Sequence, residues 1–314
     1  MDLILSILGL LLGALVCGWL ATRAWRVHRP VLRWPGLVLA AMGTLVLALV
    51  AILALVGVYR FERPPSVPAA TQPVSASPER LARGQHLANL CTTCHSTTNQ
   101  LPLDGGNQNF LGPLATLYAP NLTPAGPLAE WSDGDIARAV RDGVARDGRS
   151  LLIMPADTFH AMSDQDAQSV VAYLRSQPPV VHDTPQTELH LLGAILGAFG
   201  ALPMTAQAPT TTPAVAPPRA ATPAYGEYLL NVSGCRTCHG ENLMGGTNAF
   251  VPRGPALAEI VPSWSTAQFL STIRTGQDPN GVQLPPDMMP WPQFSATWSD
   301  DDLRAIDAYI RTLH

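Results

Sequence analysis

Two five-residue strings, CTTCH at Cys91–His95 and CRTCH at Cys235–His239, constrain this 314-residue chain more than any other feature. Cysteines three positions apart lie on one face of a helical turn, and a histidine follows them at once. Such a string can close into a redox disulfide, bind zinc or attach haem covalently. A zinc site usually takes four ligands from paired clusters. The contiguous histidine therefore favours covalent haem, with a dithiol or a zinc knuckle as the alternative.

The sequence around the two strings repeats. EWSDGDIARAVRDG aligns with SWSTAQFLSTIRTG, and VVAYLRS aligns with AIDAYIRT. Each copy opens with an N-cap residue before a proline, Ser77 and Thr222. Later serine–aspartate pairs have the spacing of a capping box: Ser163 with Asp166, and Ser299 with Asp302. Strand signals are scarce, so we predict an all-α chain with two small tandem domains whose thin cores a large covalently held group completes.

Two apolar runs precede the repeats. Leu3–Ala21 and Pro35–Tyr59 are uncharged over 19 and 25 residues. A bilayer core of about 30 Å takes about 20 helical residues, so both runs can span it as a transmembrane hairpin. The segment between them carries four arginines, which predicts a cytoplasmic loop and places both termini outside. A cleaved signal peptide followed by a single anchor is the alternative, but the start of the chain has no positive charge.

Composition divides the chain further. Thirty prolines, about twice the usual share, predict extended linkers that bury no core. The apolar stretch 187–203 is too short to span a membrane, and we expect it to pack on the first domain or to rest on the membrane surface. Both repeats are acidic, which does not suggest a nucleic-acid partner. The expected division is a transmembrane hairpin at 1–61, a linker at 62–77, a domain at 78–182, the apolar stretch and a linker at 183–220, and a domain at 221–314.

The second axial ligand of each iron must come from outside the two strings. Met154 and Met289 stand at matched positions, each before a proline and ahead of the last helix of its repeat. A thioether opposite an imidazole favours ferrous iron and raises its potential. Met288 is the rival of Met289, and Met162 and His160 are rivals of Met154. Six arginines of the first repeat are candidates to pair with haem propionates: Arg80, Arg83, Arg138, Arg141, Arg146 and Arg149.

Each repeat resembles a class I cytochrome c domain, in its glycine-bearing first helix, CxxCH string, Gly-Pro pair, late Met-Pro and Ala-Tyr last helix. The resemblance implies two covalently bound haem c groups. It also implies that the first and last helices cross, with Gly84 near Tyr173 and Gly226 near Tyr309. The haem-binding and iron-ligating residues that it implies are Cys91, Cys94, His95 and Met154 in the first repeat, and Cys235, Cys238, His239 and Met289 in the second.

In that family a proline carbonyl commonly accepts a hydrogen bond from the haem-ligating histidine, which orients the ring. Aligning the Gly-Pro pairs gives Pro113 and Pro255 this role. The segment APNLTPAGPLAEWSDGDIARAVRDGVARDGRSLLIMP, which ends at Pro155, is similar to cytochrome subunits of membrane-bound alcohol, aldehyde and sugar-acid dehydrogenases. Those subunits usually carry three haem domains and a C-terminal anchor, whereas two repeats and an N-terminal hairpin are found here.

We therefore expect a membrane-anchored dihaem cytochrome that relays electrons on the outer, periplasmic face of the cytoplasmic membrane. Its expected partners are membrane lipid, a larger integral-membrane respiratory or photosynthetic complex, and a soluble or membrane-bound electron donor or acceptor. A cytochrome subunit of a periplasmic dehydrogenase is the alternative. A dihaem peroxidase-type enzyme is less favoured because it needs an open or unusual sixth position, and we expect no catalytic residue. A haem-based sensor is weak because both termini face outward.

Overall fold

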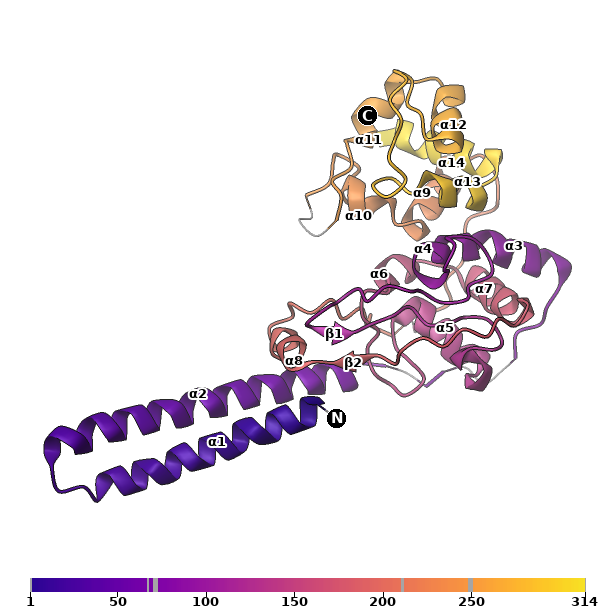
Figure 1. The fold of residues 1–314 in the computed structure, drawn as a ribbon. Coiled ribbons are helices and arrows are strands. Elements are labelled where there is room, and N and C mark those ends of the chain that lie inside the picture. Colours follow the sequence, from indigo (N-terminus) through magenta and orange to yellow (C-terminus); the bar gives the residue numbers. More distant parts are fainter. Residues whose placement is uncertain (1, 67, 70–72, 210–211, 248–250, 314) are drawn as a thin grey trace.

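The computed structural model describes residues 2–66, 68–69, 73–209, 212–247 and 251–313. Figure 1 shows a long helical hairpin at one side, a first domain beside its end, and a second domain stacked on the first. The described residues are mainly helical, as the sequence predicts. The N-terminus lies at the end of the hairpin that is nearest the first domain.

The hairpin consists of α1 (Asp2–Trp25) and α2 (Pro30–Glu62), which pack along each other. By length and composition both helices can cross a membrane. At the turn, Trp25 and Trp34 meet edge to face at 6.5 Å, and the Arg33 guanidinium lies over the Trp25 ring. Large apolar side chains are exposed along both helices, as at Leu15 (72% exposed) and Leu39 (69%). A surface of this kind requires an apolar surrounding.

The first domain is organised by the crossing of its first and last long helices. α3 (Pro78–Ala88) packs against α7 (Asp164–Ser176) at Gly84, where a Cβ atom would overlap the Ser169 carbonyl and lie 2.7 Å from the Tyr173 Cβ. The helices of this domain are α3 (Pro78–Ala88), η1 (Asn89–Cys91), α4 (Thr92–His95), η2 (Pro127–Glu130), α5 (Asp133–Asp142), α6 (Ala156–Phe159) and α7 (Asp164–Ser176). The crossing expected from Gly84 and Tyr173 is therefore present.

The second domain repeats this arrangement. α9 (Pro223–Val232) crosses α14 (Asp300–Ile310) at Gly226, where a Cβ atom would overlap the Ala305 carbonyl. Tyr309 lies beside the crossing, and its hydroxyl donates to Glu227 at 3.1 Å and accepts from Arg236 at 3.0 Å. The helices are α9 (Pro223–Val232), α10 (Cys235–His239), α11 (Leu257–Ile260), η3 (Val261–Ser263), α12 (Thr266–Thr275), α13 (Trp291–Thr297), α14 (Asp300–Ile310) and η4 (Arg311–Leu313).

The two expected capping boxes differ. Ser299 and Asp302 cap α14 reciprocally, each side chain meeting the other residue's backbone N–H. At the start of α7, Ser163 accepts from the Asp166 N–H at 3.1 Å, but the Asp166 carboxylate points elsewhere. The sequence pattern is the same, so another partner must hold Asp166.

The apolar stretch 187–203 packs on the first domain, which is one of the two arrangements expected for it. β1 (Ala115–Thr116) pairs antiparallel with β2 (Glu188–Leu189), and α8 (Leu191–Ala198) follows. α8 lies against α2 so closely that a Cβ atom on Gly57 would overlap the Ala194 carbonyl. The hairpin and the first domain are thus joined through α8.

Part of the expected second linker also belongs to the first domain. The Ile153 N–H donates to the Pro203 carbonyl at 2.9 Å, and the Thr205 N–H donates to the Leu151 carbonyl at 3.0 Å. The chain at 203–207 therefore runs as an extended segment along 151–153, and the Asp164 N–H donates to the Ala214 carbonyl at 2.9 Å further along the same linker. Residues 203–207 are extended, as the prolines predict, but Met204 packs against the buried apolar cluster that contains Leu152 and Leu202, so the prediction that this linker contributes to no core is wrong there.

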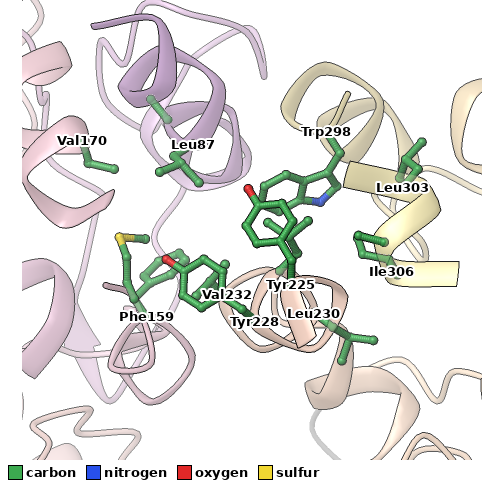
Figure 2. Packing of buried hydrophobic residues seen from close by; sticks show 14 of the residues in the cluster. Leu87, Phe159, Val170, Tyr225, Tyr228, Leu230, Val232, Trp298, Leu303 and Ile306 are labelled. Carbon is green, nitrogen blue, oxygen red and sulfur yellow. The ribbon is translucent and has the colours of Figure 1, made fainter. Parts of the chain in front are cut away.

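The two domains share one buried apolar cluster. It joins Leu87 and Val170 of the first domain to Tyr225, Leu230 and Ile306 of the second. Figure 2 shows both tyrosines of α9 within this cluster, between the helices of the two domains. The domains are therefore docked on each other and not held by the linker alone.

Candidate functional site

The first CxxCH string forms the helical turn that its spacing predicts. Cys91 ends η1, and Cys94 and His95 lie in α4, directly after the crossing helix α3. Both cysteines are half-buried and His95 is buried. The turn thus presents two thiols and an imidazole along one short segment, fixed by α3 behind it.

A proline carbonyl orients His95, but it is not the one predicted. The His95 Nδ1 donates to the Pro120 carbonyl oxygen at 2.8 Å. The Pro113 carbonyl instead lies 3.2 Å from the Nδ1 of His190, which packs at the start of α8. The assignment of Pro113 is wrong because the first repeat holds a longer loop, so the Gly-Pro pair that aligns by sequence falls inside the inserted residues.

Backbone hydrogen bonds fix the equivalence of the two loops. The Gly105 N–H donates to the His95 carbonyl, and the Gly106 N–H to the Ala119 carbonyl. In the second domain Gly245 and Gly246 donate in the same way to His239 and Gly254. The residue after each second acceptor is the histidine partner, 25 positions beyond the histidine in the first domain and 16 in the second.

The second string forms α10, and the expected bond is present there. The His239 Nδ1 donates to the Pro255 carbonyl oxygen at 2.9 Å. Gly254 lies against the imidazole, and a Cβ atom on it would come within 2.6 Å of the ring Cε1. The Gly-Pro pair therefore has two separate uses here, since the glycine gives the ring room and the proline carbonyl orients it.

These bonds determine which ring nitrogen is free. A carbonyl oxygen can only accept, so the Nδ1 carries the proton in both histidines. Burial lowers the pKa of His95 and of His239, and the bond to the proline carbonyl opposes this shift. Each imidazole is therefore neutral, with the Nε2 lone pair available for a metal.

The cysteines are protonated in their buried surroundings. Burial raises the pKa of Cys91 to about 12 and also raises the pKa of Cys94, Cys235 and Cys238. A zinc site needs further ligands around each cysteine pair. Among the residues that the structure describes, no group of three His, Cys, Asp or Glu side chains is placed to hold a metal ion. The donor set does not support the zinc alternative.

Met154 and Met289 have matching backbone surroundings. Each is followed by a proline that begins a short helix, with φ −76° and ψ 57° at Pro155 and φ −76° and ψ 55° at Pro290. The carbonyl of each methionine accepts a 2.7 Å bond from the residue after that proline. Both side chains are half-buried and pack against the shared apolar cluster.

The rival ligands are placed differently. Met288 is 51% exposed, whereas its neighbour Met289 is half-buried. Met162 is only 2% exposed and belongs to the apolar cluster itself. His160 uses its Nδ1 to donate to the Arg141 carbonyl at 3.1 Å. Burial and backbone geometry therefore favour Met154 and Met289.

The second domain contains a cavity that tests the fit of haem. It has a volume of about 280 Å³ and is lined mainly by apolar side chains. Its wall includes both cysteines of the string, His239, Met289 and the rival Met288, with Trp264 and Phe294 among the apolar residues. Two thiols for thioether links, an imidazole and a thioether sulfur around one apolar space fit a covalently attached haem.

The six arginines considered for haem propionates all have protein partners. Arg83 is buried against Asp166, with 2.7 Å between the Nη2 and the Oδ2. The others are partnered as follows: Arg80 with Ser75, Arg138 with Asp135, Arg141 with Asp164, Arg146 with Glu130, and Arg149 with Asp147. In this structure their side chains are therefore already partnered by protein groups, some of them on the same element and some, as with Arg83, on another.

Two family models match the chain over its two domains. Residues 81–178 match the family described as Cytochrome c, and residues 221–310 match the family described as Cytochrome C oxidase, cbb3-type, subunit III. The matched ranges fall on the two repeats, one on each.

Known proteins similar to this chain include subunits of dehydrogenases. A subunit of the nicotinate dehydrogenase of Pseudomonas putida is 32% identical over 76% of this chain and 22% of that protein. The cytochrome c subunit of a quinone alcohol dehydrogenase of Gluconobacter oxydans is 25% identical over 74% of this chain and 54% of its own length. The fructose dehydrogenase cytochrome subunit of Gluconobacter japonicus is 23% identical over 77% and 55%. The chain thus spans about half or less of these relatives.

Proposed function

Because this chain is a dihaem cytochrome c, with one cytochrome c domain at each family match, we propose that it is a membrane-anchored electron relay. The observation that carries this proposal is the pairing, in both domains, of two thiols and an oriented neutral imidazole with a methionine at an equivalent backbone position. Haem held in this way supplies an iron that gains and loses one electron.

We assign the haem-holding roles by residue. Cys91 and Cys94 would form the thioether links of the first site and His95 and Met154 would ligate its iron, while the Pro120 carbonyl orients the imidazole. In the second site Cys235 and Cys238 would form the links and His239 and Met289 would ligate the iron, while the Pro255 carbonyl orients the ring. A metal-ligating histidine held by a backbone carbonyl keeps its orientation and gains basicity. The domain boundaries 78–182 and 221–314 remain our proposed division.

The ligand set favours electron transfer over bond-making chemistry. A dihaem peroxidase needs an iron with an open or unusual sixth position, and a half-buried methionine is available at both sites. The absorption band of methionine bound to ferric iron distinguishes the two functions. We expect this band from both sites, whereas a high-spin haem with peroxide turnover would favour the enzyme.

Membrane anchoring is supported by the hairpin. Both helices are long and apolar enough to span, and their large side chains are exposed. The arginines Arg23, Arg26, Arg29 and Arg33 gather around the turn that joins them. The positive-inside rule places this turn in the cytoplasm and the haem domains on the outer, periplasmic face. Docking of α8 on α2 holds the first domain close to the membrane surface.

The relatives favour a dehydrogenase as the electron donor. Three of them are subunits of nicotinate, alcohol and fructose dehydrogenases, and two of these are named as cytochrome subunits. We therefore favour a dehydrogenase partner over a respiratory or photosynthetic complex of another type. In either case the electrons leave to a soluble or membrane-bound acceptor.

Purification in mild detergent tests the partner directly. We expect the chain to co-purify with a dehydrogenase subunit, identified by mass spectrometry, and to become reduced when that enzyme's substrate is added. A protease added to intact spheroplasts should cleave the haem domains. Purification of the lone subunit in every mild detergent would contradict the dehydrogenase proposal, and protection from protease would contradict the topology.

A further inference from the structure

Asp166 does not do what its counterpart in the second repeat does. Asp302 turns back to cap α14, accepting from the Ser299 N–H at 2.9 Å. Asp166 has the same sequence position at the start of α7, yet its carboxylate accepts from Arg83 and from Tyr228. Arg83 belongs to the first domain and Tyr228 to the second. The repeat comparison therefore identifies Asp166 as a residue diverted from local capping to the domain interface.

Both oxygens of the Asp166 carboxylate accept hydrogen bonds. Arg83 donates through Nε and Nη2 at 2.9 and 2.7 Å, which is a two-point pair. The Tyr228 hydroxyl donates to the second carboxylate oxygen at 2.7 Å. Arg219, from the segment between the domains, adds a contact at 3.5 Å. Three separate parts of the chain thus converge on one side chain.

Tyr228 also replaces the missing half of the cap. Its hydroxyl oxygen accepts from the Ser163 N–H at 3.1 Å, the group that Asp166 would have satisfied in a reciprocal capping box. A side chain of the second domain therefore completes the helix start of the first domain. The hydrogen bonding at the start of α7 is therefore complete only when the two domains are docked.

The network is buried. Arg83 is 5% exposed, Asp166 3% and Tyr228 8%. Although burial raises the pKa of Asp166, the Arg83 and Tyr228 hydrogen bonds lower it below its ordinary value. Arg83 and Asp166 both belong to the first domain, so separation of the domains leaves their ion pair intact but removes the Tyr228 hydrogen bonds from the Asp166 carboxylate and from the Ser163 N–H. The guanidinium of Arg83 also lies 5.9 Å from the ring of Trp298 in the second domain.

The docked arrangement brings the two candidate sites together. η1, which ends in Cys91, packs against α13 of the second domain, and the Asn89 Nδ2 lies 3.5 Å from the Ala296 carbonyl. Phe294 in the same helix lines the cavity of the second site. The attachment turn of one site thus touches a helix that forms the wall of the other.

We infer that Asp166 and Tyr228 are positioning residues that lock the two domains in this arrangement and thereby set the rate of electron exchange between the two sites. The inference rests on the proposed function and extends it. In the exchange, one iron is oxidised by one electron and the other is reduced by one, while no bond is made or broken and no proton is required. Only the separation and orientation of the sites are under the control of these residues.

Tyr228→Phe in the full-length holoprotein tests the lock, and Tyr225→Phe is its matched control. Both tyrosines lie in α9, are buried, and stack at 6.1 Å. The Tyr225 hydroxyl has no hydrogen-bond partner among the described residues, so its removal should leave the interface intact. Asp166→Asn is a second test variant, because an amide is a weaker partner for Arg83.

We expect Tyr228→Phe to raise hydrogen exchange of the Ser163 amide at least about tenfold, as the loss of a hydrogen bond to a charged group implies. Electron exchange between the haems, followed after photoreduction of one of them, should become slower or biphasic. Haem content and both midpoint potentials should stay unchanged, and small-angle scattering should show a more extended particle. If Tyr228 only stabilised the fold, Tyr228→Phe would lower thermal stability, and the rate of electron exchange between the haems would not change independently of the midpoint potentials.

Two results would overturn the inference. One is hydrogen exchange and scattering in Tyr228→Phe that match those of Tyr225→Phe. The other is opening of the interface with an unchanged electron-exchange rate. If the wild-type protein carries no covalent haem, the proposed function fails, but the hydrogen-exchange contrast between the two tyrosine variants still decides whether the interface is locked.

Discussion

Replacing Gly226 by alanine should destabilise the second domain through one added methyl group. The new Cβ would overlap the Ala305 carbonyl and lie 2.9 Å from the Ile306 nitrogen, where ordinary contact begins at 3.4 Å. The obstacle is backbone, so α9 and α14 must move apart. Overpacking of this kind costs about 3 kcal/mol at the upper end of its usual range. Alanine regains about 1 kcal/mol of helix propensity. The net loss is about 2 kcal/mol.

A loss of about 2 kcal/mol lowers the melting temperature of a domain of this size by about 8–16 °C. Calorimetry of the holoprotein, with haem absorbance followed in parallel, measures this shift. Gly18→Ala is the control, because it makes the same change inside a helix where the nearest atom, the Thr44 Oγ1, is 3.8 Å away. It should melt within a few degrees of wild type. A Gly226→Ala protein that melts like the control would refute the close crossing of α9 and α14.

Three further predictions concern the ligands, the interface and the anchor. Met289→Leu should remove the methionine–iron band of one haem while Met288→Leu leaves it, because Met288 is 51% exposed; the reverse pattern would exchange their roles. The pKa of Asp166 is lowered in the folded protein, so its ionised form stabilises the fold at pH values above the ordinary carboxyl pKa of about 3.9, and this stabilisation is lost as the pH falls below that value. Urea titrations should therefore show a steeper loss of unfolding free energy from about pH 5 to about pH 3 in the wild type than in Asp166→Asn. Equal slopes in the two proteins would contradict the assignment. Gly57→Leu should separate α8 from α2 because the Ala194 carbonyl blocks the new side chain; faster proteolysis after residue 62 would show this, and an unchanged cleavage rate would count against it.

Local sequence signals predicted the local structure well. The N-caps at Ser77 and Thr222, the helical turns of both CxxCH strings and the helix crossing at Gly84 follow from steric and hydrogen-bonding rules that act within a few residues or recur in both repeats. The Pro255 carbonyl was also found, because the second repeat keeps a short loop.

The errors arose where a partner came from far along the chain. Pro113 was chosen by its Gly-Pro pair, whereas the loop that returns to His95 brings Pro120 there. A signal was present in the sequence, since the string APN at 119–121 offers a proline, but only the backbone pairing of Gly106 with Ala119 identifies it. Likewise, the spacing of Ser163 and Asp166 predicts a capping box. No residue near α7 in the sequence indicates that Asp166 instead accepts from Tyr228, which lies 62 positions away.

The central claim is that each CxxCH string holds a covalently bound haem. A pyridine haemochrome assay of the purified chain, combined with mass spectrometry of its proteolytic peptides, tests it most directly. The account predicts two haem c groups per chain, one on the peptide containing Cys91 and Cys94 and one on the peptide containing Cys235 and Cys238. Pigment that acidified acetone extracts from the protein, or peptides of unmodified mass at both strings, would contradict it.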